Sequence, residues 1–312
     1  MAFIGIDIGG TYTKCALVDA HSNILASSQV PTNPDGGVKA ILGSINRAVA
    51  ELNNTQPLEC ACLGIPGPID LATNSVVMAP NLGWMTRTDI CSAAADLLQC
   101  PVYVANDAIC AACGEAHFGA GQTFKSFLLL TLGTAVGAAL TQNGKPFLGC
   151  GRYSAELGHI PLVHGGLPCS CGIDGCFEQY GSATALVRIA LSYAKDDPAS
   201  MLATADESKV RAEDVIASVA SGDKAAQRAF DEYTTYLAEG TAGLVNIFRP
   251  EAVIYAGGLA NADELLCKTM QTKLLERVCA SEVVGAPKVV VSQNASNIGA
   301  LGAAVIATQR HS

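Results

Sequence analysis

The sequence predicts an α/β fold with two lobes of similar design, and three observations support this prediction. Buried-strand patterns alternate with helical patterns along most of the 312 residues. Two predicted strands, residues 3–7 and 127–132, run directly into a turn that contains glycine and threonine. Each turn leads into a second strand pattern, at residues 14–18 and 136–141, so the same arrangement of strand, turn and strand occurs twice.

The other predicted elements keep this alternation. In chain order they are helix 37–52, strand 60–64, strand 101–105 with a helix beginning at Asn106 and Asp107, helices 183–194, 212–219 and 224–248, strand 252–256, helix 263–280, strand 288–292 and helix 298–309. No low-complexity linker divides the chain, and local glycines at residues 118–123 mark the predicted boundary between the lobes.

The composition favours a cytoplasmic protein whose partners are small molecules. Lys and Arg number 19 against 28 Asp and Glu, the formal net charge is −9, and no basic cluster offers a track for phosphates, which argues against nucleic acid as a partner. No apolar run reaches about 18 residues, and residues 1–12 lack the blocks of a signal peptide. We therefore expect a soluble chain with no membrane partner.

The thirteen cysteines fall into two groups. An odd number without an export signal argues against a disulfide framework. Ten cysteines are scattered through apolar or helical stretches, where a free thiol acts as a small core hydrophobe. The other three lie close together within residues 169–176.

The turn after the first strand has the residues of a nucleotide phosphate loop. Gly9 and Gly10 allow φ > 0 and a close approach of backbone N–H groups to phosphate oxygens. Thr11 adds a hydroxyl and Lys14 a cation, while Asp7 just before the glycines favours a magnesium nucleotide. The alternative is an ordinary hairpin turn, where Gly-Gly is also common.

Two further loops have the same character. Gly133 and Thr134 follow the strand at residues 127–132, and Gly257 and Gly258 lie between a strand and a helix. Either loop alone is more typical of a plain connection. Together with the first turn they make three loops at strand ends, where α/β folds bind phosphates and nucleosides.

Asn106 and Asp107 lie at a strand end and a helix start. Asp107 fits two interpretations, a helix cap or first-turn acid, and a general base that faces a nucleotide. An alcohol must lose a proton as it attacks a γ-phosphate, and phosphoryl transfer otherwise requires positioning and charge neutralisation. One well-placed carboxylate is enough for that chemistry.

The most specific segment combines a histidine with three cysteines. Cys169, Cys171 and Cys176 lie within eight residues, and glycines occupy the turns between them. With a histidine they supply the four ligands of a tetrahedral zinc site. On spacing alone, either His159 or His164 can be the fourth ligand.

Glu156 and Glu178 flank this cysteine segment, so closing it is expected to bring two carboxylates together. Carboxylates on a rigid element suit the recognition of several sugar hydroxyls, because each unpaired buried hydroxyl costs about 1–3 kcal/mol. The alternative is a pair of solvated surface acids.

These motifs resemble those of the ROK family of bacterial sugar kinases, within the actin, Hsp70 and hexokinase superfamily. The resemblance covers nearly the whole chain and rests on residues 7–11, 64–68, 81–84, 106–107, 156–159, 169–178 and 299–304. It implies a two-lobed actin/Hsp70/hexokinase-like (ribonuclease H-like) ATPase fold with a zinc knot. It also implies a last helix that returns to the N-terminal lobe, which gives lobes of 1–118 plus 298–312 and of 119–297.

The resemblance also implies roles for individual residues. Asp107 becomes the catalytic base, and Thr11, Thr134, Gly257 and Gly258 belong to loops that hold ATP with Mg²⁺. The residues implied to bind sugar hydroxyls are Asn81, Asn106, Glu156, His159 and Glu178. His159 becomes the fourth zinc ligand, through the ring nitrogen that is not used on the sugar.

The predicted function is an ATP-dependent kinase that phosphorylates the 6-hydroxyl of a hexose. Residues 81–84 and 176–184 look most like the glucokinase branch, so glucose is the first substrate; kinases of N-acetylmannosamine, N-acetylglucosamine and β-glucosides share most of the motifs. A non-catalytic sugar sensor is the second hypothesis and an Hsp70-like ATPase the third. The first strand begins at residue 3, which leaves no room for the DNA-binding domain of related repressors, and homodimers are common in the family.

One departure from the family concerns the second phosphate loop. The family usually has more glycine there than residues 133–139 do. Alanine can block φ > 0 and a close backbone approach. This departure therefore bears on ATP affinity and not on the fold.

Overall fold

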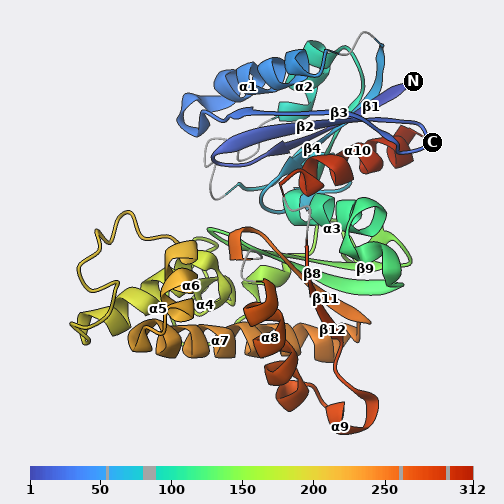
Figure 1. Ribbon diagram of the computed structural model, residues 1–312. Coiled ribbons are helices and arrows are strands. Elements are labelled where there is room, and N and C mark those ends of the chain that lie inside the picture. Colours follow the sequence, from blue (N-terminus) through green and yellow to red (C-terminus); the bar gives the residue numbers. More distant parts are fainter. Residues whose placement is uncertain (54–55, 80–88, 260–262, 293–295, 312) are drawn as a thin grey trace. The chain divides into compact units, whose positions relative to one another are not determined.

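The computed structural model describes residues 1–53, 56–79, 89–259, 263–292 and 296–311 (Figure 1). They form two compact units: Met1–Ser126 with Ala139–Glu156 and Asn294–Ser312, and Phe127–Ala138 with Leu157–Gln293. Residues 119–126 and 139–156 therefore group with the first unit, whereas the sequence-based division places them in the second lobe.

The first unit is built on a five-stranded sheet with the order β3-β2-β1-β4-β7. Its strands are β1 (Ala2–Ile8), β2 (Tyr12–Asp19), β3 (Ile24–Pro31), β4 (Leu58–Ile65) and β7 (Val102–Asn106). β1 pairs antiparallel with β2 and parallel with β4, which in turn pairs parallel with β7. The carboxyl ends of β1, β4 and β7 therefore meet at one edge of the sheet, the edge at which open α/β folds bind ligands.

Four helices cover the two faces of this sheet (Figure 1). They are α1 (Gly37–Glu51), α2 (Ile90–Leu98), α3 (Asp107–Phe118) and α10 (Ile298–His311). Ile4 and Ile6 of β1 pack on the α1 and α2 side with Ile45, whereas Phe3 packs on the α3 and α10 side with Ala300. This alternation follows from the two-residue period of a strand.

Glycines allow α10 to approach β1 and α3 closely. A Cβ atom at Gly5 would lie 2.0 Å from the carbonyl oxygen of Ala300, and one at Gly302 would lie 1.7 Å from that of Cys110. These neighbours are backbone atoms, which cannot rotate away, so a larger residue does not fit at either position. Helix α10 thus packs on β1 and α3 of the first unit.

The second sheet has the order β10-β9-β8-β11-β12. Its strands are β8 (Ser126–Leu132), β9 (Val136–Gln142), β10 (Lys145–Pro146), β11 (Ala252–Ala256) and β12 (Lys288–Val291). β11 pairs parallel with both β8 and β12. A separate two-stranded hairpin, β5 (Ile69–Asp70) with β6 (Ser75–Val76), follows β4 in the first unit.

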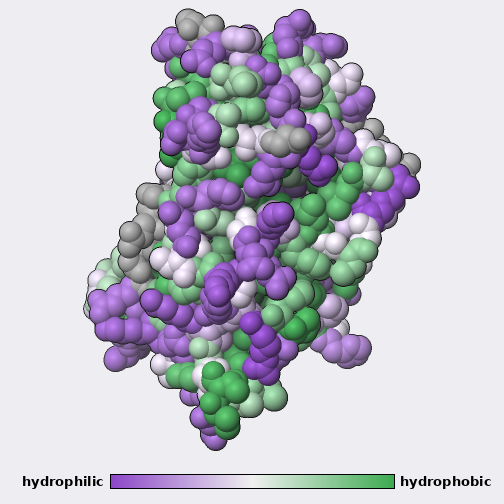
Figure 2. Space-filling model, turned by 90° about the vertical axis from the view of Figure 1, so that its right-hand side faces the viewer, coloured by the Kyte–Doolittle hydropathy of each residue, from purple (hydrophilic) through white to green (hydrophobic). Residues whose placement is uncertain are grey.

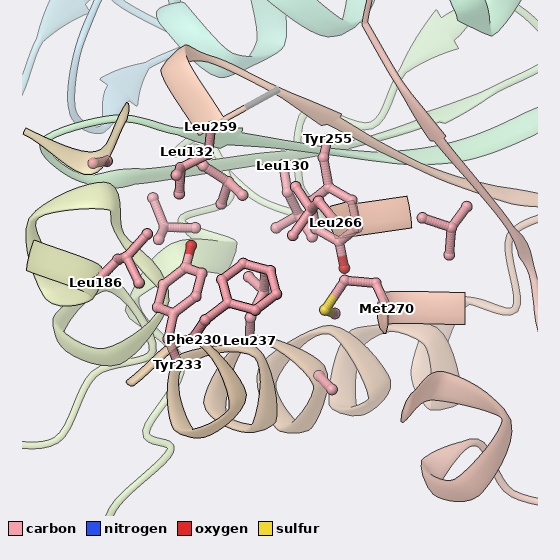
Figure 3. Close-up of a cluster of buried hydrophobic side chains, with 14 of the residues drawn as sticks. Leu130, Leu132, Leu186, Phe230, Tyr233, Leu237, Tyr255, Leu259, Leu266 and Met270 are labelled. Carbon is pink, nitrogen blue, oxygen red and sulfur yellow. The ribbon is translucent and has the colours of Figure 1, made fainter. Parts of the chain in front are cut away.

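The core of the second unit lies between its sheet and the long helix α7 (Figure 3). The helices of this unit are α4 (Glu178–Gly181), α5 (Ala183–Lys195), α6 (Ala212–Ala220), α7 (Lys224–Phe248), α8 (Asp263–Arg277) and α9 (Ser281–Val284). Phe230, Tyr233 and Leu237 of α7 point toward Leu130 and Tyr255 of the sheet. The buried hydroxyls of the two tyrosines have partners. The Tyr233 hydroxyl donates to the carbonyl oxygen of Gly181 (2.9 Å), and the Tyr255 hydroxyl lies 3.1 Å from the Thr241 hydroxyl.

The strands and helices predicted from periodicity are confirmed, with ends within about three residues. The sequence analysis missed β3, which is largely exposed and rich in serine, and α2, whose N-cap is Asp89. It was also wrong about some of the ten scattered cysteines, because Cys150 and Cys279 are exposed and Cys267 is only partly buried.

The surface is mixed in character. On the face shown in Figure 2, hydrophilic and hydrophobic side chains are interspersed, and a small hydrophobic group lies at the lower end, at the level of α9. Val283 and Val284 of α9 are 87% and 68% exposed. Among the described residues, no helix combines the length and the apolar character that crossing a membrane requires.

Candidate functional site

Two aspartates mark the ligand-binding edge of the first sheet. Asp7 is the next-to-last residue of β1 and pairs in register with Lys14 of β2. Asp107 is the first residue of α3 and comes directly after β7. Both carboxyl groups are thus placed by regular backbone elements and not by loops, which is the more rigid way to hold a reactive group.

Burial raises the pKa of both aspartates, and the charge of Asp107 also acts on Asp7. Burial raises the pKa of the Asp7 carboxyl from 3.8 to about 6; the charge of Asp107 adds to the rise, and the Lys14 ammonium opposes it. Burial also raises the pKa of Asp107, although the N–H of Ala108 donates to its Oδ1 (2.8 Å) and lowers it. A paired, partly desolvated carboxylate is a better proton acceptor than a solvated one, and perturbed acids of this kind cluster at functional sites.

Asn106, and not Asp107, caps helix α3. Its Oδ1 accepts the N–H groups of Ala108 (2.9 Å) and Ile109 (3.2 Å), and its Nδ2 donates to the carbonyl oxygen of Gly67 (3.2 Å). Gly67 has φ +101°, which glycine tolerates and other residues rarely do. An amide group has two N–H donors, so Asn106 keeps one for a ligand.

The turn between β1 and β2 is a tight hairpin with an open outer side. The N–H of Gly9 donates to the carbonyl oxygen of Tyr12 (3.0 Å), and Thr11 is exposed. Neither Gly9 nor Gly10 has a positive φ, contrary to the expectation from the sequence. A Cβ atom at Gly10 would meet nothing within 4 Å. The turn can therefore be both an ordinary hairpin and a phosphate loop, because the outer side of the hairpin backbone is open.

The loop between β8 and β9 in the second unit is tied to the start of α5. The carbonyl oxygen of Gly133 accepts the N–H of Ala183 (2.9 Å), and that of Thr134 accepts the hydroxyl of Thr184 (3.1 Å). Ser182 caps α5 by accepting the N–H of Ala185. The positive end of a 13-residue helix thus lies at the predicted phosphate loop, an arrangement that favours anions. The sequence analysis missed this support.

No residue described in residues 133–139 needs a positive φ. The alanines of this segment therefore fit its backbone without strain. The departure from the glycine-richer family pattern therefore causes no backbone strain here, and a Cβ at Gly133 would meet nothing within 4 Å.

The third predicted loop follows β11. Gly257 has φ +97°, and a Cβ atom on it would lie 2.5 Å from the carbonyl oxygen of Leu132, so only glycine fits. At Gly258 the nearest atom is Oε1 of Glu213, 2.8 Å from the position of a Cβ. Glu213, in the first turn of α6, is a carboxylate beside this loop that the sequence analysis did not identify.

The histidine and the three cysteines form one cluster in the second unit. The ligand atoms of His159, Cys169, Cys171 and Cys176 all lie within 4.8 Å of one another. Nδ1 of His159 is 3.5 Å from the Cys169 sulfur, and the Cys171 and Cys176 sulfurs are 3.5 Å apart. Zn–S bonds of about 2.3 Å and Zn–N bonds of about 2.0 Å in a tetrahedron place ligand atoms roughly 3.5–3.8 Å apart, so the four side chains fit zinc.

The cluster decides which histidine belongs to it. His164 is exposed and is not among the clustered side chains, so His159 is the fourth member. It faces the sulfurs with Nδ1, which leaves Nε2 for another partner, as the resemblance implies. Burial raises the pKa of the Cys176 thiol to about 12, and binding of zinc there would displace its proton.

The cluster organises the segment around it, which has little regular structure. Bridges connect Pro161 with Cys176 and Pro168 with Asp174. Gly175 has φ +79°, and a Cβ on it would lie 1.7 Å from the carbonyl oxygen of Val163. Glu178 is 9% exposed, and its Oε1 accepts the Cys169 thiol at 3.6 Å. Glu178 therefore lies against the cluster.

The remaining predicted residues are placed as follows. Glu156 is the last residue of the first unit, whereas Glu178 lies in the second, so the predicted meeting of the two carboxylates stays a prediction. Asn81, with the whole segment 81–84, lies outside the described residues.

Two mixed α/β units with loops at their strand ends, together with a His and Cys₃ cluster, define an actin-like ATPase fold that carries a metal knot. The chain matches the ROK family over residues 3–310 and belongs to that family.

Individual relatives lie in two functional groups. The glucokinase of Halalkalibacterium halodurans is 34% identical over 278 residues, which cover 86% of this chain and 84% of the relative. The structure of a ROK family glucokinase from Streptomyces griseus in complex with glucose and AMPPNP superposes with a TM-score of 0.87 at 32% identity and covers 99% of this chain and 100% of its own. The xylose repressor of Bacillus subtilis is 26% identical, over 96% of this chain and 75% of the repressor.

Proposed function

We propose that the protein transfers the γ-phosphate of ATP to the 6-hydroxyl of a hexose, with glucose as its best substrate. The observation that carries this proposal is the position of Asp107, at a strand end and helix start, with a raised pKa and with Asp7 as a charged neighbour. Family membership supports a sugar kinase, and the similarity to glucokinases supports glucose.

In the proposed reaction, the carboxylate of Asp107 accepts the proton of the attacking sugar hydroxyl. A bond forms between that oxygen and the γ-phosphorus, the bond from the γ-phosphorus to the bridging oxygen breaks, and ADP leaves with the electron pair. A raised pKa makes the Asp107 carboxylate a stronger base than a carboxylate in water. Burial also limits its competing contact with water.

The other predicted residues would bind and orient the two substrates. For the sugar hydroxyls we propose Asn106, Glu156, His159 and Glu178. For ATP we propose the loops around Gly9 and Gly133, with Gly257 and Gly258 on the adenosine side. Mg²⁺, when bound with ATP, would neutralise phosphate charge, and Asp7 is the carboxylate nearest in sequence to the first phosphate loop.

Zinc would have a structural role in this proposal. His159, Cys169, Cys171 and Cys176 would fill all four positions of a tetrahedron and leave none for a reacting ligand. The closed cluster would fix the start of α4, whose first residue Glu178 follows the ligand Cys176 by two positions, and orient the His159 ring toward the sugar.

A coupled ADP-release assay across a panel of sugars tests the proposal. The panel should include glucose, mannose, xylose, N-acetylmannosamine and N-acetylglucosamine. We expect the highest kcat/KM for glucose, with N-acylated hexosamines as the next class. If an N-acylated sugar is turned over at least tenfold better than glucose, the glucokinase assignment is wrong and the kinase assignment stands.

The similarity to a xylose repressor favours one second candidate, a sugar sensor without catalysis. Such a protein would bind a sugar, as shown by calorimetry, and release no ADP with any member of the panel. The presence of both Asp107 and the capped α3 that positions it argues for the enzyme.

A further inference from the structure

A short segment just before Glu156 is attached to the β5–β6 hairpin as an added strand. The N–H of Leu71 donates to the carbonyl oxygen of Arg152 (2.9 Å), and the N–H of Ser154 donates to that of Ile69 (3.0 Å). The hydroxyl oxygen of Ser154 also accepts the N–H of Ile69 (2.9 Å). We call residues 152–154 the strap; strap and hairpin both belong to the first unit.

An ion pair locks the strap to the hairpin. Nε of Arg152 lies 2.9 Å from Oδ1 and 2.8 Å from Oδ2 of Asp70, and its Nη2 lies 2.5 Å from Oδ2. Asp70 is only 6% exposed and also accepts the N–H groups of Ala72 and Thr73. The hydrogen bond from Arg152 holds the pKa of this carboxyl well below its usual range, which favours the ionised form.

Apolar burial contributes little to the position of the strap. The Arg152 side chain is 54% exposed, and Tyr153 is 52% exposed with the Arg152 guanidinium 5.7 Å above its ring. Ordering a chain segment costs about 1–2 kcal/mol per residue in backbone entropy. Because few apolar contacts offset that cost here, the ion pair and the three backbone-directed hydrogen bonds must do so.

The strap leads directly to Glu156. After Ser154, the N–H of Ala155 donates to the carbonyl oxygen of Leu148 (3.0 Å). Gly149, with φ +117°, makes the intervening turn; a Cβ there would lie 2.9 Å from the carbonyl oxygen of Tyr153. Hydrogen bonds thus hold the backbone up to Ala155, the residue before Glu156. Leu157, the residue after Glu156, begins the other unit.

We propose that Asp70 and Arg152 are positioning residues that hold Glu156 in the orientation required to bind sugar. Neither side chain needs to touch the substrate. The inference rests on the proposed role of Glu156 and extends it, because it makes sugar affinity depend on an ion pair that none of the sequence motifs includes. Displacing a binding group by about 1 Å is enough to lose much of its contribution.

Steady-state kinetics of Arg152→Met and Asp70→Asn test the proposal. We expect the sugar KM to rise at least fivefold in each variant, with kcat within about threefold of wild type and the ATP KM within about twofold, since only ground-state binding of the sugar is weakened. Arg152→Lys keeps the charge but loses the paired donors of the guanidinium. Its sugar KM should lie between that of the wild type and that of Arg152→Met. The sugar KM of the double variant should be no higher than that of the more impaired single variant, because each substitution alone already removes the ion pair.

Two control variants separate positioning from a general loss of stability. Arg47→Met makes the same chemical change at another arginine of the first unit, whose guanidinium bonds the carbonyl oxygen of Pro31, and should leave the sugar KM unchanged. Ile45→Val removes one methyl group from the core of the same unit and should lower Tm without changing the sugar KM.

The outcomes distinguish the inference from the proposed function. A sugar KM within twofold of wild type in Arg152→Met, with or without a lower Tm, overturns the positioning role and leaves the kinase assignment in place. Equal losses in the sugar KM and the ATP KM also overturn it. A wild-type protein that turns over no sugar of the panel refutes the proposed function itself.

Discussion

The two groups of candidate site residues are held in different ways. In the first unit, Asp7 and Asp107 follow from sheet register and a capped helix, so many backbone hydrogen bonds share the work of positioning them. In the second unit, Glu178 and His159 depend on a segment with short bridges and a four-residue helix, gathered around one cluster of side chains. Loss of a single neighbouring side chain should leave Asp7 and Asp107 in position, whereas loss of one cluster side chain should displace Glu178 and His159.

The largest difference should appear when one cysteine of the cluster is removed. We expect Cys171→Ala to lose its zinc, lower Tm and raise the sugar KM, while the ATP KM changes less than about twofold. Structural zinc contributes about 10–16 kcal/mol in small zinc-binding peptides, and part of that should appear here because the rest of the unit has its own core. Elemental analysis, thermal unfolding and kinetics measure the three effects.

Cys279→Ala is the matched control, since it removes an exposed thiol from the same unit. It should keep zinc, Tm and kinetics. Absence of zinc from wild-type protein purified without chelator, or an unchanged Tm and sugar KM in Cys171→Ala, would contradict the structural role of the cluster.

The second prediction concerns the chemistry of the first unit and not its stability. Asp107→Asn should lower kcat by about 10²–10⁴, the usual cost of losing a general base. Sugar and nucleotide affinities should be nearly unchanged, because Asn106 and not Asp107 caps α3. Kinetics and calorimetry with both ligands would show this separation.

Asp89→Asn provides the control for this change. It makes the same substitution at the cap of α2, where asparagine caps as well as aspartate does, so activity and stability should stay near wild type. A kcat within threefold of wild type in Asp107→Asn would remove Asp107 as the base.

The same contrast explains what the sequence could predict. Periodicity predicted most of the strands and helices, because the core-facing residues of β1, β4 and α7 recur with the period of their element. The cysteine spacing predicted the cluster but did not decide whether His159 or His164 is the fourth ligand. Only the fold showed that His164 is exposed and lies outside the cluster. Spacing measures distance along the chain and not direction in space.

Contacts between residues far apart in sequence could not be predicted. The ion pair of Asp70 with Arg152 joins residues 82 apart, and the bond from Thr184 to the loop at Thr134 spans 50. Glu213 beside Gly258 is a similar case. Each partner alone resembles an ordinary surface residue, and nothing in its neighbouring sequence identifies the other.

The third prediction tests the packing that makes the first unit rigid. Gly302→Ala places a methyl group 1.7 Å from the carbonyl oxygen of Cys110, so α10 and α3 must separate. We expect a loss of about 1–3 kcal/mol in the free energy of unfolding. Gly43→Ala in α1 is the control, because its Cβ would meet nothing within 4 Å; alanine there should be neutral or stabilise by up to about 1 kcal/mol. Equal stabilities of the two variants in urea unfolding would contradict this packing.

The smallest expected effect has the opposite sign, because Asp7 is a proposed site residue whose raised pKa indicates a cost in stability for the ligand-free protein. Its pKa is about 6 in the folded state against 3.8 as the ordinary value, so the folded state holds a proton that the unfolded state releases between about pH 4 and pH 6. Stability from this group therefore falls as the pH rises through that window and is constant above it. Asp7→Asn should raise Tm only slightly at pH 4.5 and more at pH 8, with an upper bound of about 3 kcal/mol for two pKa units.

Asp19→Asn is the informative comparison for that measurement. The side chain and backbone of Asn23 hold the pKa of Asp19 below its usual range, so its contribution favours folding and is present at pH 8. Its substitution should lower Tm at pH 8 and have little effect at low pH, the reverse of Asp7→Asn. The gain in Asp7→Asn should come with a loss of kinase activity, as expected where a carboxylate is kept for function at the expense of stability. If Asp7→Asn is less stable than wild type at pH 8 without ligands, the charge of Asp7 is compensated in the folded protein, and its proposed availability to a magnesium nucleotide would have to be abandoned.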